Sequence, residues 1–239
     1  MAERNTENEV LKPALYIVPT PIGNREDITL RALKILSKVD IIACEDTRHS
    51  GTLLKSYNIN PNKLRSYHEH NELQQSEILV AQILSGKNVA LITDAGSPSI
   101  SDPGYRLIKT AIEHNVNIIP LPGPTAFIPA LIGSGFPTDE FHFFGFPPQK
   151  KGRASYLKKI AEQNSTSIIY ESPYKIILLL EELSEICDNT REVCIAREIS
   201  KIYEEFIRGS LSGCLNYLKS KSSIKGEFVI ILKAQKKGN

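Results

Sequence analysis

Long hydrophobic runs are missing from this 239-residue chain. The longest apolar stretches, such as residues 176–180, fall far short of the roughly 20 residues that a membrane-spanning helix needs. The first nine residues are polar and charged without an apolar centre, so we expect no secretory signal there. The sequence instead predicts a flexible tail over residues 1–12, followed by folded domains.

Cysteine is also scarce, with four residues and no CxxC pair among them. We therefore expect reduced thiols in a cytoplasmic protein and neither disulfides nor a zinc site. The string His68-Glu69-His70 places both imidazoles on one side of an extended segment. Because no third ligand accompanies them, an exposed polar turn is favoured over a metal site, and no metal is expected.

Several nucleotide-binding and catalytic motifs are absent. The chain has no GxxxxGK[ST] phosphate loop, no GxSxG elbow and no HExxH helix. Its one GxG pair, at residues 133–135, follows a helical pattern and lacks the third glycine of a dinucleotide-binding fingerprint. The same lack excludes the glycine-rich first loop of Rossmann-like methyltransferases. Kinase, dehydrogenase and hydrolase functions are all disfavoured.

The composition is that of an ordinary globular protein, with 41% hydrophobic and 23% charged residues. A length of 239 residues allows one large domain or two small ones. The net charge of +2 neither requires nor excludes a nucleic acid, so an RNA partner would need a local basic patch.

The first half of the chain alternates between strand and helix patterns. Asp27 is expected to cap a helix in which Leu30, Leu33 and Leu36 share a buried face, and Asp46 or Thr47 to begin the next helix. A helix that ends at Ser85 is expected to be closed by Gly86. Strands are predicted at 14–18, 39–44, 64–67, 88–93 and 116–121. Strands separated by helices indicate parallel βαβ units.

A proline-rich stretch at 120–124 marks a boundary in the pattern. A short helix over 125–131 is expected to end at Gly133-Ser134-Gly135. Beyond it, strands are predicted at 141–146, 167–170, 193–197, 203–208 and 227–234, with helices at 153–162, 174–186 and 211–219. The predicted fold class is α/β, with a mostly parallel five-stranded sheet in residues 13–122, a mixed sheet in 123–239, and a cofactor cleft between the two domains.

Unusual loops follow four strands of the first half: 19–24, 45–49, 94–104 and 122–126. Because the carboxyl ends of parallel strands meet at one edge of a sheet, we expect these loops to converge on a ligand. The 94–104 loop is rich in small residues, which let a ligand approach the backbone. Asp102 and Pro103 are expected to be the N-cap and first residue of the helix that follows, at 103–114.

The motifs themselves resemble a known family. PTPIGNREDIT at 19–29, CEDTRHS at 44–50, TDAGSPSISDPG at 93–104, PLPGPTA at 120–126, YESPY at 170–174 and AREISK at 196–201 resemble the tetrapyrrole-methylase superfamily. Within it, they are most similar to the small-subunit ribosomal RNA methyltransferases. This resemblance spans nearly the whole chain. It implies S-adenosylmethionine-dependent 2′-O-methylation of a cytidine in the decoding region of 16S RNA.

Two departures from the family pattern are visible. Family members usually carry two small residues after PLPG, where this chain has Pro124 and Thr125. They also commonly continue into a small helical C-terminal extension, whereas this sequence ends soon after its last predicted strand. If that extension holds RNA, affinity for the substrate is expected to come from elsewhere, such as a partner subunit.

The resemblance implies which residues contact the cofactor, folded up between two domains. They are Pro21, Asp94, Ala95, Gly96, Ser97, Ile100, Ser101, Asp102, Thr125, Ala126, Tyr170, Glu171, Ala196 and Gly226. For the first three groups, at 21, 94–102 and 125–126, the residues themselves also indicate a ligand site, because small residues at strand ends let backbone groups hold a polar ligand. For Ala196 and Gly226, a buried strand residue and a turn glycine remain equally good interpretations.

Transfer of a methyl group to a ribose hydroxyl benefits from a nearby proton acceptor. Asp94, Asp102, Glu171 and Glu198 are candidates, and the sequence assigns none of them. Asp102 competes as a helix cap, and Glu198 as the ion-pair partner of Arg197.

The RNA is expected to meet two segments. One consists of Glu45, Asp46, Thr47, Arg48 and His49, and the other is a basic loop with Lys150, Lys151 and Arg153, which follows Phe144 and Phe146. Positive charge beside aromatic rings suits a phosphate backbone with a splayed base. A solvated loop is the alternative for the second segment, and an internal pair with Asp46 is the alternative for Arg48.

Two other functions stay open at this point. One is a methyltransferase acting on a tetrapyrrole or another small acceptor, which the EDTRH string disfavours. The other is a non-catalytic regulator that binds RNA or the cofactor. The resemblance also implies a homodimer, with the assembled small ribosomal subunit or its RNA as the partner.

Overall fold

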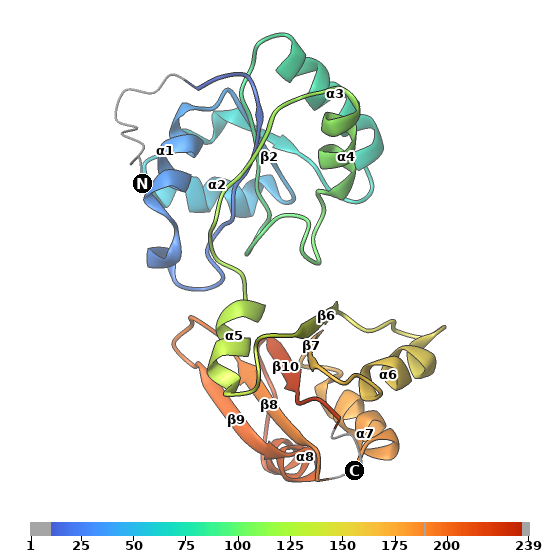
Figure 1. The fold of residues 1–239 in the computed structure, drawn as a ribbon. Helices are drawn as coiled ribbons and strands as arrows, with labels where there is room; N and C mark the ends of the chain where they lie inside the picture. Colours follow the sequence, from blue (N-terminus) through green and yellow to red (C-terminus); the bar gives the residue numbers. More distant parts are fainter. Residues whose placement is uncertain (1–10, 189, 236–239) are drawn as a thin grey trace. The chain divides into compact units, whose positions relative to one another are not determined.

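The structure is a computed structural model that describes residues 11–188 and 190–235 (Figure 1). The chain divides into two compact units. Unit 1 contains the residues up to Pro21 and Arg25–Pro124, and unit 2 contains Ile22–Asn24 together with the chain from Thr125 onward. Three residues near the start of the chain therefore belong to unit 2, although most of unit 1 follows them in the sequence.

Unit 1 is built on a parallel sheet. Its strands are β1 (Leu15–Ile17), β2 (Ile41–Cys44), β3 (Leu64–Ser66), β4 (Val89–Leu91) and β5 (Ile118–Pro120). They pair in the order β3-β2-β4-β1-β5, and every pairing is parallel. The connecting helices are η1 (Arg25–Asp27), α1 (Leu30–Lys38), α2 (Thr47–Ser56), η2 (Pro61–Lys63), α3 (Glu72–Leu84) and α4 (Tyr105–Glu113). The predicted five-stranded parallel sheet is confirmed.

Both faces of this sheet are covered by helices, because successive strand residues point to opposite sides. Ile42 and Ala90 belong to a buried cluster with residues of α1 and α2. Their neighbours Ala43 and Leu91 belong to a second cluster, with residues of α3 and α4. This arrangement gives unit 1 three layers and explains why its strands are continuous apolar runs.

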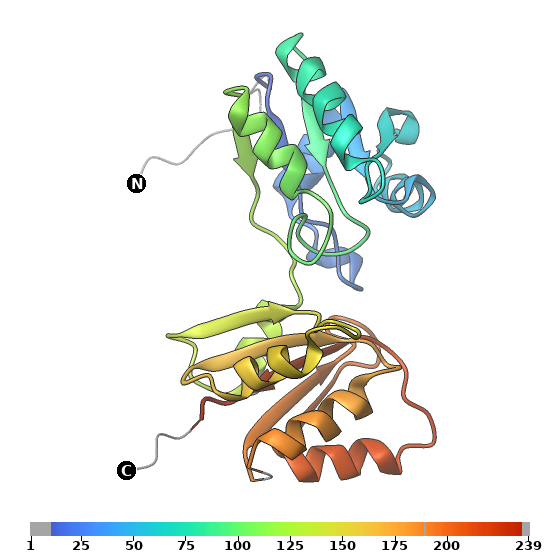
Figure 2. The same cartoon turned by 90° about the vertical axis from the view of Figure 1, so that its right-hand side faces the viewer.

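Unit 2 contains the mixed sheet that the sequence predicts. Its strands are β6 (Phe141–Gly145), β7 (Thr166–Glu171), β8 (Glu192–Arg197), β9 (Glu205–Ser210) and β10 (Phe228–Leu232), in the order β6-β7-β10-β8-β9. The β6–β7 pairing is parallel, and the others are antiparallel. Its helices are α5 (Phe127–Ser134), α6 (Arg153–Ala161), α7 (Ile176–Ile186) and α8 (Leu211–Ser220). Residues of α6, α7 and α8 pack on one face of the sheet and residues of α5 on the other, as Figure 2 shows.

Helix boundaries test the predicted caps. Of the two residues predicted as the start of α2, Asp46 is the N-cap and Thr47 the first helical residue, and the Asp46 carboxylate accepts the backbone N–H of Arg48 at 2.7 Å. Gly86 follows the end of α3 with a φ of +98°, which also confirms the prediction. The predicted cap of α1 is wrong, because Thr29 rather than Asp27 accepts the N–H of Ala32 at 3.0 Å. The earlier residue lies in the 3-10 turn that precedes the helix.

Two further expectations are corrected. Leu30 is 86% exposed, so Leu30 does not share the buried face of α1 that contains Leu36. Helix α5 also continues through Gly133 to Ser134, and its C-cap is Gly135, which has a φ of +75°. A Cβ on Gly133 would lie 2.5 Å from the ring of Phe206, so this glycine allows α5 to approach β9 closely.

All four cysteines are free, and three of them are buried. Within residues 11–188 and 190–235, no helix has the length and apolar character to cross a bilayer. The same residues contain no group of three or more histidine, cysteine or carboxylate side chains arranged to hold a metal ion.

Candidate functional site

Four loops meet at the carboxyl edge of the unit 1 sheet, and hydrogen bonds join them. Thr20, after β1, exchanges two backbone hydrogen bonds with Gly96, after β4, at 2.9 and 3.0 Å. The backbone N–H of Asp46, after β2, donates to Asp94 at 3.3 Å. The hydroxyl of Ser97 donates to the carbonyl of Pro124, after β5, at 2.9 Å. The predicted convergence of these loops is confirmed, with the 94–104 loop at its centre.

The 94–104 loop has an unusual backbone. Gly96, Ser99, Ser101 and Gly104 all have positive φ values, of 82°, 72°, 63° and 151°. A Cβ on Gly104 would lie 3.1 Å from both Leu91 Cδ2 and the backbone nitrogen of Ser99. Non-glycine residues with positive φ persist only where the surrounding structure enforces them, and they gather at ligand sites.

This backbone overturns the predicted start of the helix. Helix α4 begins at Tyr105, with Gly104 in the cap position and no side-chain cap. Asp102 is therefore not an N-cap, and Pro103 lies outside the helix. The turn from Ser99 to Gly104, in which the N–H of Ser99 donates to the carbonyl of Pro103 at 3.3 Å, separates the carboxylate from the helix.

Asp102 does not cap a helix, and it belongs to a group of carboxylates with Glu45 and Asp94. Burial, followed by the charges of Glu45 and Asp94, raises the pKa of Asp102 to about 7. Burial and the neighbouring charges of Asp94 and Glu69 likewise raise the pKa of Glu45. Carboxylates held together in this way favour a bound cation, which would relieve their mutual repulsion.

The segment after β2 presents one face to solvent. Thr47, Arg48 and His49 are exposed, and the Arg48 side chain retains 91% of its accessible surface. Its guanidinium contacts the carboxylate of Asp46 at 2.8 Å, so the internal pair considered from the sequence is present. Hydrogen bonds from Arg48 hold the pKa of Asp46 well below its usual range.

The predicted cofactor residues of unit 1 differ in accessibility. Pro21 and Gly96 are buried, whereas Asp94, Ser97 and Asp102 are half-buried. Three further members of the set are exposed: Ala95, Ile100 and Ser101. The buried members shape the loop, and the remaining members present side chains or backbone groups to a ligand.

The predicted site residues of unit 2 lie at one edge of its sheet. Glu171 and Ala196 belong to the ends of β7 and β8, and Gly226 precedes β10. Ala196 is fully buried, so its side chain serves the core. Gly226 has a φ of +99°, and a Cβ there would lie 2.5 Å from the side chain of Glu198. Thr125 and Ala126 are half-buried at the start of this unit.

Glu198 has a partner other than the expected one. Its carboxylate contacts Lys201 at 2.8 Å, whereas Arg197 pairs with Glu205 at 3.5 Å. Glu198 is therefore half of an ion pair, which the sequence offered as the alternative to a catalytic role, but its partner is Lys201 rather than Arg197. Burial alone would raise the pKa of Glu198, but the hydrogen bonds from Lys201 and from the backbone of Glu227 lower it overall.

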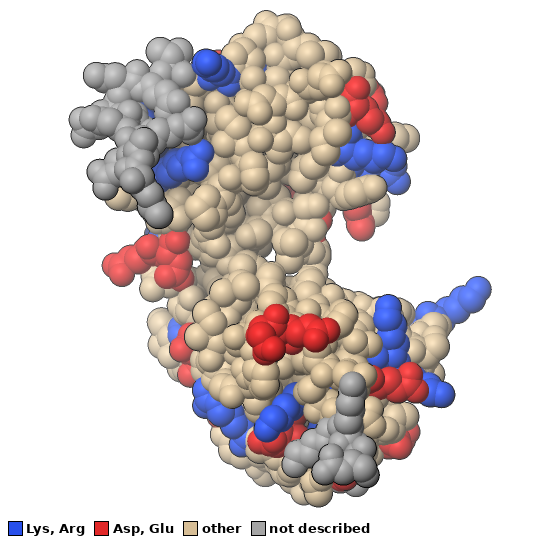
Figure 3. Space-filling view, viewed as in Figure 1, with Lys and Arg blue, Asp and Glu red and all other residues tan. Residues whose placement is uncertain are grey.

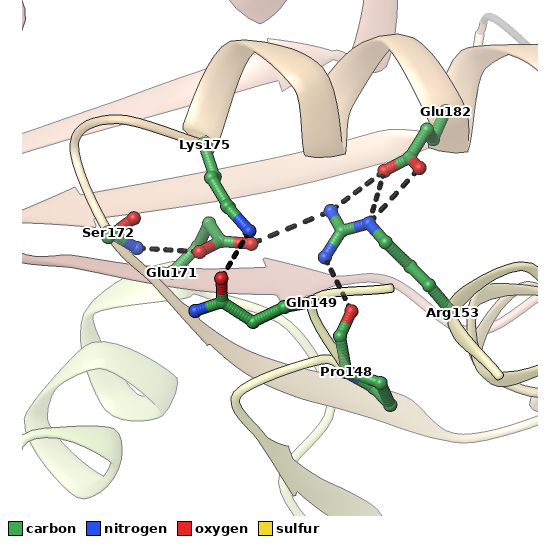
Figure 4. Close-up of polar contacts among 7 residues, drawn as sticks. All are labelled: Pro148, Gln149, Arg153, Glu171, Ser172, Lys175 and Glu182. Carbon is green, nitrogen blue, oxygen red and sulfur yellow. Dashed lines mark hydrogen bonds and ion pairs between the residues drawn. The ribbon is translucent and has the colours of Figure 1, made fainter. Parts of the chain in front are cut away.

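Arg153 is also corrected, since it is a buried residue at the start of α6 and not part of an exposed basic loop (Figure 4). Its guanidinium contacts Glu182 at 2.7 Å and Glu171 at 3.6 Å, and it donates to the carbonyl of Pro148 at 3.2 Å. Hydrogen bonds to Glu182 raise the pKa of Arg153 despite its burial. The positive charge that this loop presents to solvent comes from Lys150 and Lys151, which are exposed.

Glu182 could not be predicted as a partner of Arg153, because it lies 29 residues away on another helix. Elsewhere, Lys and Arg are interspersed with Asp and Glu over the face shown in Figure 3. Neither sign forms a continuous patch there, in keeping with the net charge of +2.

Comparisons with known proteins identify the family. A family model for tetrapyrrole (corrin/porphyrin) methylases matches residues 14–214. The ribosomal RNA small subunit methyltransferase I of Hydrogenobaculum sp. (strain Y04AAS1) is 47% identical over 91% of this chain and 94% of that protein. The enzymes of the same name from Vibrio cholerae and Escherichia coli O157:H7 are 46% and 45% identical, over 92% and 93% of this chain and 77% and 78% of theirs.

Solved structures share the fold at low sequence identity. A cobalt precorrin-4 methyltransferase superposes with a TM-score of 0.68 at 16% identity, covering 92% of this chain and 95% of that one. A uroporphyrin-III-C-methyltransferase from Thermus thermophilus gives a TM-score of 0.62 at 17% identity, with 91% and 93% covered. Together with the family model and the close relatives, these likenesses show that the chain belongs to the tetrapyrrole methylase family, and within it to the group of ribosomal RNA small subunit methyltransferases I.

Proposed function

We propose that this protein transfers a methyl group from S-adenosylmethionine to the ribose 2′-hydroxyl of a cytidine in the decoding region of 16S ribosomal RNA. One observation carries the proposal. The loops joined at the carboxyl edge of unit 1 contain the EDTRH and DAGSPSISDPG strings, in a chain 42–47% identical to relatives named ribosomal RNA small subunit methyltransferase I.

The residues of the unit 1 edge fit this cofactor. S-adenosylmethionine carries positive charge on its sulfonium and amino groups, and Glu45, Asp94 and Asp102 form a partly desolvated carboxylate group that would attract them. The backbone of the 94–104 loop, opened by Gly96 and Gly104, would hold its polar groups. The proposed cofactor residues remain those inferred from the family, with Ala196 contributing through its backbone.

For methyl transfer, the protein's main task is to position the cofactor and the ribose hydroxyl. The bound cofactor supplies an already activated methyl group. The chain must hold the hydroxyl in line at about 3–3.5 Å, exclude water and accept a proton. Of the four candidate acceptors, Glu171 and Glu198 are engaged with Arg153 and Lys201. Asp94 and Asp102 remain, and the pKa of Asp102 suits a proton acceptor near neutral pH.

On the substrate side, we propose the segment 45–49, of which residues 47–49 are exposed, together with Lys150 and Lys151 as RNA contacts. Arg153 is left out, because its guanidinium is enclosed by Glu171 and Glu182. Methylation of a tetrapyrrole is not favoured. The structural neighbours that act on such molecules are 16–17% identical and share only the fold, whereas the relatives above 40% identity carry the ribosomal name.

A ribosomal substrate would place the protein in the cytoplasm, and the family resemblance supports a homodimer as the working form. Sedimentation of the purified chain at micromolar concentration tests the dimer directly.

Labelled S-adenosylmethionine and small ribosomal subunits from cells lacking this enzyme test the activity. We expect label in a 2′-O-methylcytidine of the 16S RNA. Label in a small acceptor but not in RNA would contradict the proposal, and binding of the cofactor without any transfer would favour a regulator instead.

Substitution of Arg48 by Ala tests the substrate side of the same reaction. Its exposed side chain is expected to contact RNA, so the variant should raise the KM for RNA about tenfold while leaving the affinity for S-adenosylmethionine unchanged. Substitution of the exposed Arg31 by Ala serves as the control. Equal loss of cofactor and RNA binding in R48A would contradict its placement on the substrate side.

A further inference from the structure

The loops that follow β6, β7 and β8 lie at one edge of the unit 2 sheet. Strands β6 and β7 are parallel, and β10 is antiparallel to both β7 and β8, so β8 runs in the direction of β7. Glu171, Phe228 and Arg197 are paired across these strands at that edge. We use "loop edge" for residues 146–151, 172–175, 198–204 and 225–227, which surround it.

The loop edge exposes large apolar side chains. Tyr174 is 95% exposed, Ile202 93%, Tyr203 72% and Phe146 56%. They come from three separate loops, so the exposure is not the outer stripe of one helix. Clustered exposed apolar side chains of this size mark interaction sites.

Backbone hydrogen bonds order the loops that carry two of these side chains. The segment with Tyr174 is a turn in which the N–H groups of Lys175 and Ile176 donate to the carbonyl of Ser172, both at 3.1 Å. The segment with Tyr203 is closed by the N–H of Glu204 donating to the carbonyl of Lys201 at 3.1 Å. Because these turns are already ordered, their backbone loses little freedom when a partner binds.

Phe146 is supported differently. Its ring lies 5.5 Å from that of Tyr170, edge to face, at the end of β7. The loop edge therefore offers aromatic surface beside a residue that we propose as a cofactor contact.

The charge of the loop edge is positive, with five lysines and three glutamates. Lys150, Lys151 and Lys225 are exposed and have no carboxylate partner among the described residues. Lys175 donates to the side-chain amide of Gln149 at 2.7 Å, as Figure 4 shows, and so keeps its charge uncompensated.

The remaining lysine is neutralised. Lys201 contacts Glu198 at 2.8 Å and Glu227 at 3.0 Å, and the third glutamate, Glu204, accepts the N–H of Ser200 at 2.8 Å. The carboxylates thus stabilise the loop that carries Tyr203. The three glutamates outnumber Lys201 there, so the other four lysines leave the loop edge as a whole positive by two charges.

We propose that the loop edge is a stacking surface for unpaired bases of the RNA that flank the methylated nucleotide. Tyr174 and Tyr203 would stack on bases, and Lys150, Lys151 and Lys225 would meet the phosphates. Exposed aromatic rings interleaved with unpaired cations are how proteins bind single strands, because every base has a face to stack and every linkage carries a charge. The inference rests on the proposed function, since it names the part of unit 2 that holds the same substrate.

The chain lacks tryptophan, which makes a direct test possible. Single variants Y174W and Y203W each introduce one indole emitter that preserves stacking. Titration with an oligocytidylate of about ten nucleotides is expected to quench both emitters, since that length suits a single-strand site. Tyr105 of α4 in unit 1 is 68% exposed and provides the matched control Y105W, whose emission should not change.

Alanine variants measure the contribution to affinity. Y174A and Y203A should each weaken binding of the same oligonucleotide about 5- to 100-fold, whereas Y105A should bind like the parent. Unquenched indoles at positions 174 and 203, or alanine variants with parental affinity, would overturn the proposal. The same holds if the parent binds no single-stranded RNA.

A methyl-transfer assay distinguishes failure of the stacking surface from failure of the proposed function. If the parent transfers no label to small subunits but both indoles are quenched, the proposed function fails and the stacking surface stands. If Y174A and Y203A methylate subunits with the parental KM and neither indole is quenched, the stacking surface alone is overturned.

Discussion

The carboxyl group of Asp102 has a pKa of about 7, against an ordinary value of 3.8. Its burial and the charges of Glu45 and Asp94 cause this shift. Because the pKa is higher in the folded chain than in the unfolded chain, the folded state binds the proton more tightly between these two values. Stability is therefore lost as the pH rises from about 4 to about 7.

We predict that D102N removes this loss. In the absence of cofactor at pH 8, the free energy of unfolding of the variant, measured with urea, should exceed that of the parent by about 2–4 kcal/mol. At pH 4 the two should differ little. The exposed Asp139 provides the control D139N, which should match the parent at both values. A D102N variant that gains nothing between pH 4 and pH 8 would contradict the shifted pKa.

At the scale of elements, the 94–104 loop depends on Gly104. An alanine there has the strained φ of +151° and also meets Leu91 and the backbone of Ser99 at 3.1 Å. Gly86 shares the positive φ, at +98°, but a Cβ there has nothing within 4 Å.

We therefore predict that G86A costs about 1 kcal/mol of unfolding free energy and that G104A costs at least about 2–3 kcal/mol. G104A should also weaken the binding of S-adenosylmethionine, measured by calorimetry, whereas G86A should not. Equal losses in the two variants would show that the close contacts at Gly104 relax freely.

The same loop shows what the sequence could and could not predict. The parallel sheet followed from buried apolar runs between helical patterns, and the convergence of the loops followed from strand direction. The predicted cap at Asp102 was wrong. Its side chain is of a capping type, but the positive φ values of Ser101 and Gly104 turn the backbone so that the helix starts only at Tyr105. Such backbone angles arise from packing and leave no pattern in a single sequence.

The segment at 148–153 shows a second limit. Lys150, Lys151 and Arg153 look equivalent in the sequence, yet only the arginine meets two carboxylates, on β7 and α7. Those partners are distant along the chain, so the burial of Arg153 could not be foreseen. Asp46, in contrast, caps a helix that starts one residue later, and this local relation was predicted correctly.

This difference predicts opposite effects of substitution. K150A and K151A together should leave stability within about 0.5 kcal/mol of the parent and lower the slope of log K against log salt for RNA binding by about 1.4. R153A should destabilise unit 2 by about 3–5 kcal/mol, since it leaves the buried Glu171 and the half-buried Glu182 beside no cation.

Urea unfolding and RNA binding at several salt concentrations check both parts. An unchanged salt slope in the lysine variant would remove these residues from the RNA contacts. A stable R153A would mean that water reaches the two carboxylates.

At the scale of the whole molecule, the proposed cofactor residues belong to both units. Asp94 and Ser97 are in unit 1, whereas Tyr170 and Gly226 are in unit 2. S-adenosylmethionine at about 100 times its Kd should stabilise the protein by about 2.7 kcal/mol.

We predict that this stabilisation reaches both units. Hydrogen exchange measured by mass spectrometry should slow in peptides covering 92–104 and in peptides covering 168–175. Peptides covering α3, which contains none of the proposed cofactor residues, serve as an internal control. Slowing confined to one unit would contradict the assignment of cofactor contacts to the other.

The membership of Ile22–Asn24 in unit 2 has a consequence for synthesis. Ile22 packs against a cluster that includes Val229 and Ile231, from the last strand of the fold. At about 5–20 residues per second, a ribosome makes Ile22 on the order of 10–40 s before those partners exist. The segment Ile22–Asn24 is therefore made well before its packing partners, and unit 2 is completed only after β10 has been synthesised.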